Sequence, residues 1–405
     1  MRLLVVTNLY PPQELGGYGR AMADFVWGLQ QRGHHLQIVT SDSAYLNPST
    51  TAASNSIGPS GELVCRRLQL KGSYQGGVQG LSDPGIRASI DQANIQLLRN
   101  WLRFSWDAVL LGNLDLLGVE LLSVLLEPGI PVLHHVGFVS APFHPQQMPH
   151  APNYHLIAAS KAVREGLVAA GLPVGQAPVV YPGARTELFG TQVSGHPAAV
   201  SAAVALSKAG FAWGSPANPL KLGFAGLMMA SKGAHTVVEA LISLHQQGIT
   251  VQAAFAGGSF QTGYREQLEL MLNQAGLSGA VRFVGQLARP QLARFWALHQ
   301  VGVFGSIHPE AFGIVAAEIM ASGLALLTTG VGGAAELIEP GKNGLLFEAG
   351  NGASLVKCLQ QLLADPGLLQ NLACNGEQRV KDLFSVDISA KQLEQLSVSS
   401  AVFVL

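Results

Sequence analysis

Apolar runs alternate with amphipathic stretches along most of the chain. The run RLLVVTN is followed by the helical pattern RAMADFVWGLQQRG and then by HLQIVTS, which is the β-α-β alternation of a parallel sheet. In the first half this alternation continues through VCRRL, a helix near residues 86–103, WDAVLLGN, PVLHHVGF, HLIAASK and PVVYPG. We therefore predict roughly six or seven strands there.

The alternation restarts at LKLGFAG, after a stretch rich in Gly, Pro, Ser and Ala. It continues through HTVVEALISLHQQG, VQAAFAGG, a helix near residues 264–275, VRFVG, PQLARFWALH, VGVFGS, FGIVAAEIMASG, LALLTTG, AAELIEPG and GLLFE. We predict an α/β fold with two doubly wound parallel-sheet domains. The first domain is placed at residues 1–190, a linker at 191–218, the second domain at 219–380, and a helical tail returning to the first domain at 381–405.

The composition excludes several functions. At 405 residues the chain exceeds the usual single-domain size, and 48% hydrophobic with only 12% charged residues suits sheets that are buried on both faces. Lys and Arg total 24 against 25 Asp and Glu, so no general field would attract nucleic acid or anionic lipid. The cysteines Cys65, Cys358 and Cys374 have no CxxC spacing, which predicts neither a disulfide framework nor a zinc site.

The sequence predicts no leader and no membrane span. The apolar run in MRLLVVTNLYPP is too short for a signal peptide and lacks a small-residue cleavage pattern. The stretch LDLLGVELLSVLL contains Asp115 and Glu120 and is shorter than the approximately 20 residues that cross a bilayer. We expect a cytoplasmic protein, and peripheral contact with the inner face of the membrane stays open.

The segment HPEAFGIVAAEIMASG carries the clearest chemistry. We expect a helix to begin near Ala311 or Phe312, with Glu310 at its mouth and free backbone N–H groups around Gly313 that favour a diphosphate. Glu318 lies about two helical turns, or roughly 12 Å, beyond Glu310. Because each carboxylate can accept two hydrogen bonds from vicinal hydroxyls, the pair predicts a diol clamp for a sugar nucleotide rather than an acid/base dyad.

The alternative is that Glu310 only complements the helix dipole and that Glu318 is solvated, each worth under about 1 kcal/mol. The apolar surroundings AAEIMA argue against it, because an unpaired buried carboxylate is costly and a ligand would supply its partner. The turn TTGVGGAAELIEPG repeats the pattern, with Gly332 and Gly333 before a helix that has Glu336 in its first turn. Glycines there would let a ligand approach the backbone.

The segments EAFGIVAAEIMASG and GVGGAAELIEPGKNGLLFE resemble the Glu-x7-Glu signature of glycosyltransferase family 4. The resemblance implies the GT-B fold, in which two Rossmann-like domains face each other across a cleft, with the acceptor on the N-terminal side and the donor on the C-terminal side. It also implies retaining, metal-independent transfer of a hexose from a UDP-, GDP- or ADP-sugar to a glycan, lipid or small molecule, as in polysaccharide biosynthesis. The resemblance implies no cofactor other than the donor and no metal, while the balanced charge predicts no nucleic-acid partner.

The resemblance also implies roles for individual residues. Glu310 would contact hydroxyls of the donor sugar, Glu318 the ribose, and Lys232 in FAGLMMASKGAHTVVEAL the diphosphate. A surface lysine after a turn is the second-ranked alternative for Lys232. Leu227 stands where the family has an arginine, and Leu supplies neither charge nor donor. A replacement could come from Arg20, Arg185 or Arg289. The other residues implied at the donor site are Phe312, Gly313, Ile314, Val315, Gly226, Gly333, Val284, Gln286, Gly16 and Gly17.

In the first half, LGGYGRAMADFVWGLQQRGHHLQIVT resembles the opening glycine loop of the family, which carries Gly16 and Gly17. A double glycine after Pro-Pro can also be an ordinary turn. His135, which ends the strand PVLHHVGF, is the nominee for a functional histidine near the transferred sugar, and a hydrogen-bonded structural histidine is the equal alternative. The glycine-rich residues 72–85 are the candidate acceptor loop.

Two other functions compete with transfer. A nucleotide-sugar epimerase would share the sheets and the phosphate turns but needs acid/base carboxylates at strand ends, which the sequence lacks. A non-catalytic or weakened nucleotide-sugar-binding homologue is favoured by Leu227.

Overall fold

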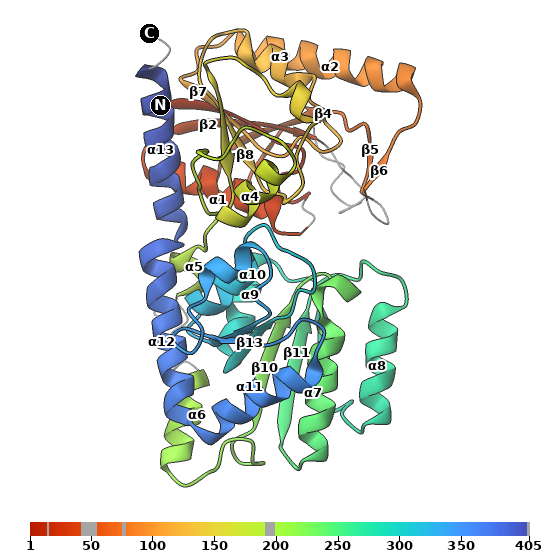
Figure 1. The fold of residues 1–405 in the computed structure, drawn as a ribbon, viewed down its shortest axis with the longest axis vertical. Helices are drawn as coiled ribbons and strands as arrows, with labels where there is room; N and C mark the ends of the chain where they lie inside the picture. Colours follow the sequence, from red (N-terminus) through yellow and green to blue (C-terminus); the bar gives the residue numbers. More distant parts are fainter. Residues whose placement is uncertain (14–15, 42–54, 75–77, 191–198, 403–405) are drawn as a thin grey trace. The chain divides into compact units, whose positions relative to one another are not determined.

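The computed structural model describes residues 1–13, 16–41, 55–74, 78–190 and 199–402 (Figure 1). The chain divides into two compact units: unit 1 is Met1–Pro182 with Val386–Leu405, and unit 2 is Gly183–Ser385. The division therefore falls after Pro182 rather than after residue 190. Residues 199–218 belong to unit 2 instead of forming a linker, and residues 191–198 lie outside the described residues.

Unit 1 is built on a seven-stranded sheet in the order β3-β4-β2-β1-β7-β8-β9. All neighbouring strands are parallel except β3 and β4, which are antiparallel. The strands are β1 Arg2–Val6, β2 His35–Ser41, β3 Asn55–Ile57, β4 Leu63–Leu68, β7 Ala108–Leu111, β8 Val132–Val136 and β9 Tyr154–Ala158. β1, β7 and β8 are buried almost throughout, which is why they are apolar runs in the sequence.

Some helices of unit 1 begin at side chains that cap them. The helices of this unit are α1 Tyr18–Gln31, α2 Pro84–Leu102, α3 Leu121–Leu126, the 3-10 turn η1 Pro145–Gln147, α4 Lys161–Ala169 and α13 Val386–Val402. The Asp83 carboxylate caps α2 by accepting from the N–H groups of Gly85 and Ile86, and Ser160 caps α4 through the N–H of Val163.

Two predictions in unit 1 need correction. PVVYPG forms no strand and contributes only an isolated bridge between Val179 and Ala158, because prolines at both ends remove the donors that a ladder needs. The candidate acceptor loop contains a short hairpin, β5 Gly72–Ser73 with β6 Gln79–Gly80, and then the start of α2. Its residues 75–77 lie outside the described residues.

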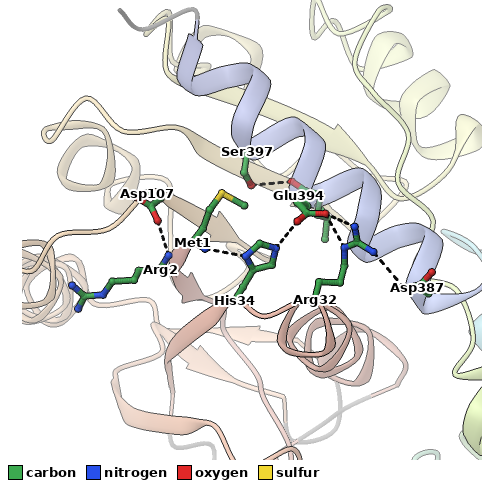
Figure 2. Close-up of polar contacts among 9 residues, drawn as sticks. Met1, Arg2, Arg32, His34, Asp107, Asp387, Glu394 and Ser397 are labelled. Carbon is green, nitrogen blue, oxygen red and sulfur yellow. Dashed lines mark hydrogen bonds and ion pairs between the residues drawn. The ribbon is translucent and has the colours of Figure 1, made fainter.

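The C-terminal helix α13 packs against α1 within unit 1 (Figure 1). Gly28 permits the close approach, because a Cβ at this position would lie 2.8 Å from the Cβ of Ala390. Figure 2 shows the polar contacts at one edge of this packing. Arg32 donates to Glu394 through Nε (2.8 Å) and Nη2, and His34 Nε2 lies 3.0 Å from the other oxygen of the same carboxylate.

Unit 2 has a six-stranded sheet in the order β12-β11-β10-β13-β14-β15, and all its neighbouring strands are parallel. The strands are β10 Leu220–Ala225, β11 Val251–Ala256, β12 Val281–Gly285, β13 Val301–Phe304, β14 Ala325–Thr328 and β15 Leu345–Leu346. The order runs outward from β10 in both directions. This is the doubly wound topology expected from the alternation of the sequence.

The helices of unit 2 connect and cover these strands. They are α5 Thr186–Phe189, α6 Ala199–Lys208, the 3-10 turn η2 Ala230–Lys232, α7 Ala234–Gln246, α8 Tyr264–Gln274, α9 Arg289–Ala297, α10 Ile314–Ala321, the 3-10 turn η3 Gly333–Leu337, α11 Gly352–Ala364 and α12 Pro366–Leu383. α7 packs against α8 and α11, while α12 packs against α6 and α10 (Figure 1). α11 was absent from the sequence-based prediction. The Asn351 side chain caps it through the N–H of Ser354.

Two further features concern membranes and metals. Among the described residues, every helix is too short or too polar to cross a bilayer. In the same part of the chain, no three His, Cys, Asp or Glu side chains are grouped so that they could hold a metal ion.

Candidate functional site

The candidate site lies where the strand order of unit 2 reverses. The chain proceeds from β10 to β11 and β12 on one side and then crosses to β13, β14 and β15 on the other. Ligands of open α/β sheets bind outside the carboxyl ends of the strands at such a reversal. The segments that leave β10 and β13 at this point are residues 226–233 and 305–313.

These two segments pack directly on each other. Gly233 adopts a φ of 75°, and a Cβ there would overlap the carbonyl oxygen of Gly305. The N–H of Ile307 donates to the carbonyl oxygen of Ser231 at 2.8 Å. Glycine at position 233 therefore meets two demands, a left-handed backbone and a close approach.

The close packing brings Lys232 and Glu310 together. Lys232 Nζ lies 2.5 Å from Glu310 Oε1, and the Ser306 hydroxyl donates to the same carboxylate oxygen. The side chains of Lys232 and Glu310 are 29% and 20% exposed. The predicted phosphate contact and the predicted sugar contact are thus ion-paired neighbours that both reach solvent.

Helix α10 begins later than expected. Its first residue is Ile314 and its N-cap is Gly313, whose φ of 95° places it in the left-handed region, so Ala311 and Phe312 are not helical. Ile314 and Val315 are half-buried in the first turn, where backbone N–H groups have no intrahelical acceptor. The Phe312 side chain is buried, with its ring 5.8 Å from that of Phe384, so only its backbone is available to a ligand.

The double glycine 332–333 has a different role from the one predicted. The N–H of Gly333 donates to the carbonyl oxygen of Glu310 at 2.7 Å, and a Cβ at Gly333 would overlap the carbonyl oxygen of Ala311. The residues after it form the 3-10 turn η3, not an α-helix that opens with Glu336. Gly333 therefore supports the loop that carries Glu310, and its N–H is already bonded within the protein.

Glu318 is fully buried, and its partner is a protein side chain. Arg289, the first residue of α9, places Nη2 3.3 Å from Glu318 Oε1. The solvated alternative for Glu318 is therefore wrong. A ligand is not needed to explain the buried carboxylate, because Arg289 supplies a partner.

The strand ends beside β10 form a rim that includes three of the other predicted residues. The N–H of Gly226 donates to the carbonyl oxygen of Ala256 at 2.9 Å, and Gln286 Oε1 lies 3.5 Å from the position of a Cβ on Gly258. Val284 is 40% exposed on β12. The half-buried Leu227, which follows Gly226, provides no cation at this rim.

The predicted residues in unit 1 have contacts of their own. Gly16 has a φ of 65° and Gly17 is the N-cap of α1; residues 14 and 15 of the same loop lie outside the described residues. His135 is buried, with Nε2 2.8 Å from the carbonyl oxygen of Val180 and Nδ1 3.2 Å from the hydroxyl of Tyr18. Burial lowers the pKa of His135 to about 4, so its ring is neutral at neutral pH. These contacts favour the structural alternative for His135.

Sequence reasoning missed two features of the site. The first is Ser306, which donates to Glu310. It ends the segment VGVFGS, and a polar residue at the end of an apolar strand is the sequence signal that could have indicated it. The pairing of Arg289 with Glu318 was also missed. Its signal is a cation in the first turn of a helix, where the helix dipole disfavours positive charge unless an anion lies nearby.

Comparisons with known proteins bear on the family and the fold. Residues 208–379 match the model of the family described as glycosyl transferases group 1. Glycogen synthase from Mycobacterium tuberculosis is 24% identical over 417 residues, which cover 99% of this chain and 95% of that protein. Among solved structures, a glycosyltransferase from Rickettsia africae has a TM-score of 0.75 at 16% identity over 98% of both chains. HepE from Anabaena in complex with UDP has a TM-score of 0.72 at 20% identity, covering 98% of this chain and 100% of that one.

The family match covers most of unit 2, including β10, β13 and α10. Together with the full-length relative it supports a glycosyltransferase, whose group 1 segment contains the candidate site. The structural neighbours confirm the predicted fold class, an α/β protein of the GT-B type with two Rossmann-like units.

Proposed function

We propose that unit 2 binds a nucleotide-diphosphate sugar at the carboxyl ends of β10 and β13, and that the protein transfers the hexose with retention of configuration. The observation that carries this proposal is the Lys232–Glu310 pair at the strand-order reversal, directly before the N-terminus of α10. A cation for the diphosphate and a carboxylate for sugar hydroxyls stand side by side there. They match the two adjacent parts of one donor molecule.

Donor binding exchanges the partners of this pair. The diphosphate takes the ammonium of Lys232 and the N–H groups in the first turn of α10, which point toward the same region as the positive end of the helix dipole. Glu310, once free of Lys232, accepts hydrogen bonds from two hydroxyls of the hexose. Ser306 still donates to one oxygen of Glu310 and holds the carboxylate in place.

These groups also act on the transition state. The bond between the anomeric carbon and the phosphate oxygen breaks, the acceptor oxygen bonds to that carbon on the same face, and the acceptor proton passes to a phosphate oxygen. Negative charge grows on the leaving diphosphate, where Lys232 and the α10 N–H groups stabilise it. This route requires neither a protein nucleophile nor a metal ion.

The remaining predicted residues take supporting places in this proposal. Gly226, Val284 and Gln286 border the nucleoside end along the rim of strand ends, and Gly333 holds the Glu310 loop. Gly16 and Gly17 keep their predicted role as donor contacts, and His135 orients Tyr18. The structure of HepE with UDP supports a uridine nucleotide as the first donor to test. We also propose a cytoplasmic enzyme that meets its sugar or lipid acceptor in solution or at the membrane surface.

A weakened homologue that only binds nucleotide sugars is the second candidate. Leu227 favours it, because it stands where the family resemblance implies an arginine, so Lys232 lacks the second cation expected in the loop after β10. The deciding experiment incubates the purified protein with UDP-, GDP- and ADP-hexoses and follows donor consumption by transfer or slow hydrolysis. Consumption of one donor supports the transferase. Tight donor binding without consumption, in the presence of a broad acceptor panel, supports the binding protein instead.

A further inference from the structure

Arg379, on α12, holds the segment that follows the double glycine 332–333. Its Nε donates to the carbonyl oxygen of Leu337 at 2.8 Å, and its Nη2 donates to the carbonyl oxygen of Glu336 at 3.1 Å. Its Nη1 forms an ion pair with the carboxylate of Glu339. The donors of a guanidinium have fixed directions in one plane, so this one side chain fixes the end of η3 and the residue just beyond it.

The same guanidinium also lies over an aromatic pair. Arg379 Cζ is 5.6 Å from the centre of the Phe384 ring, which is within the range of a cation–π contact. The Phe384 ring is 5.8 Å from the ring of Phe312, and both side chains are buried. Phe312 stands two residues after Glu310, so this second contact of Arg379 leads back to the loop of the candidate site.

The loop of Glu310 is therefore supported from two directions, and Arg379 contacts both supports. On the η3 side, the N–H of Gly333 donates to the carbonyl oxygen of Glu310 at 2.7 Å, and the N–H of Glu310 donates to the carbonyl oxygen of Val331 at 3.3 Å. On the other side, the buried ring of Phe312 packs on Phe384. A carboxylate that binds hydroxyls must be held to within about 0.5 Å, and these supports decide where its oxygens lie.

The groups proposed for the diphosphate have supports of their own. In the loop of Lys232, the N–H of Lys232 donates to the carbonyl oxygen of Met229 at 3.1 Å, and the N–H of Met228 donates to that of Gly258 at 2.9 Å. Helix α10 is anchored by its buried residues from Ala316 to Ala321. A change at Arg379 should therefore move the Glu310 carboxylate and leave the diphosphate contacts in place.

We propose that Arg379 is a positioning residue that holds Glu310 where it can bind the hexose of the donor. The inference rests on the proposed function, because it assumes that Glu310 binds sugar hydroxyls. It assigns to Arg379 the part of donor affinity that comes from the hexose, and not the part that comes from the nucleoside diphosphate.

The test measures how much the hexose contributes to donor binding. Whichever of UDP, GDP and ADP binds most tightly is titrated into the full chain by calorimetry, followed by the hexose conjugate of that diphosphate that binds most tightly. The Kd of the conjugate is then divided by the Kd of the diphosphate. The variants are Arg379→Met, Arg379→Lys, Glu310→Gln and the double variant Arg379→Met with Glu310→Gln.

The matched control is Arg265→Met, in the same unit. Arg265 also pairs with a glutamate, Glu269, at 2.8 Å, and its Cζ lies 5.4 Å from the centre of an aromatic ring. This control removes the same kinds of contact at a different place.

We expect Arg379→Met to raise the Kd ratio about tenfold over the wild type, as for the loss of one hydrogen bond to a charged group, by weakening only the conjugate. Arg379→Lys should raise it nearly as much, because lysine keeps the charge but lacks the planar fork. Arg265→Met should keep the wild-type ratio. In the Glu310→Gln background, Arg379→Met should add less than about a further twofold, because it acts through that carboxylate.

Three results would overturn the proposal. The first is a wild-type ratio in folded Arg379→Met, and the second is equal weakening of diphosphate and conjugate, which is the effect of a general structural role. The third is a further tenfold rise in the double variant, which would place the effect outside Glu310. If Arg379→Met does not fold, Arg379→Lys takes its place, alone and in the double variant, and the same results decide.

Failure of the proposed function gives a different result. A folded wild type that binds neither the diphosphates nor their conjugates removes the donor site itself, and an unchanged ratio in Glu310→Gln removes the hexose contact. Both are distinct from a raised ratio in Glu310→Gln beside an unchanged one in Arg379→Met, which would overturn only the role of Arg379.

Discussion

Replacing Glu310 by glutamine separates the two roles that the site gives to this residue. Glu310→Gln removes the ion pair with Lys232 and leaves a neutral side chain of the same shape beside Ser306. We expect a small effect on stability, tighter binding of a nucleoside diphosphate without sugar, and a large loss of transfer. The three effects differ because they depend on different partners of one carboxylate.

The magnitudes follow from exposure and hydrogen-bond type. Lys232 and Glu310 are 29% and 20% exposed, so solvent screens their attraction and the pair contributes about 1 kcal/mol or less. In a unit of this size that shifts the unfolding midpoint by about 2–4 °C at most. Freeing Lys232 should improve diphosphate affinity by up to about fivefold. Losing charged hydrogen bonds of about 1.5–3 kcal/mol to the hexose should slow transfer by about 10- to 150-fold.

The assay pairs calorimetry of the nucleoside diphosphate with steady-state kinetics on the full donor. Glu377→Gln is the matched control, because Glu377 is 15% exposed and lies 2.7 Å from Lys381 Nζ, on α12. The control should lose similar stability and keep wild-type transfer. Wild-type transfer by Glu310→Gln, with unchanged diphosphate affinity, would refute this account of the site.

Three other predictions concern the scaffold. Gly28→Ala should lower the unfolding midpoint of unit 1, because the added methyl would lie 2.8 Å from a methyl of α13 and overpacking costs about 1–3 kcal/mol. Gly333→Ala should abolish donor binding while the protein stays folded, because its Cβ would push away the loop that carries the sugar-binding carboxylate. Acid should destabilise the docking of α13. Burial lowers the pKa of His34 below its ordinary 6.5, and Arg32 lowers the pKa of Glu394 below its ordinary 4.5. Both groups therefore bind fewer protons in the folded than in the unfolded state. The free energy of unfolding should decrease as the pH falls from 7 towards 4.

Each of these three predictions has its own control. Gly175→Ala and Gly279→Ala place a methyl in open space and should be neutral, so an equal loss in them would remove the packing argument. Nucleotide calorimetry checks Gly333→Ala, and undiminished binding would contradict its role under the Glu310 loop. For the pH effect, His34→Gln should flatten the dependence of the unfolding midpoint between pH 7 and 5; an unchanged slope would exclude His34 as its source.

Much of the fold could be predicted from alternating apolar runs, because strands buried on both faces leave a continuous signal. That signal fails where the backbone itself is special. Gly332 has a φ of 67°, and the turn after it becomes a 3-10 turn where the residue pattern suggested an α-helix. The start of α10 moves to Ile314 because the left-handed Gly313 ends the preceding loop. The division after Pro182 depends on contacts between distant residues, which no local pattern contains.

In the candidate site, too, contacts between distant residues could not be predicted from local sequence. The residue pattern and the family resemblance nominated Lys232 and Glu310 separately, but their pairing joins residues 78 positions apart and arises from the packing of two loops. The pairing of Glu318 with Arg289 spans 29 positions and was likewise hidden. Local sequence indicates which residue types lie at strand ends. Only the folded unit shows which charged residues form ion pairs with one another.

The most direct test of a donor site in unit 2 is thermal unfolding of the protein with UDP, GDP, ADP and their hexose conjugates, alongside Lys232→Met. A ligand at 100 times its Kd stabilises by about 2.7 kcal/mol, or roughly 5–10 °C in a unit of this size. If unit 2 holds a donor site, a shift of this size should appear with one nucleotide and its conjugates and should be lost in Lys232→Met. No shift with any nucleotide, or a full shift in Lys232→Met, would contradict it.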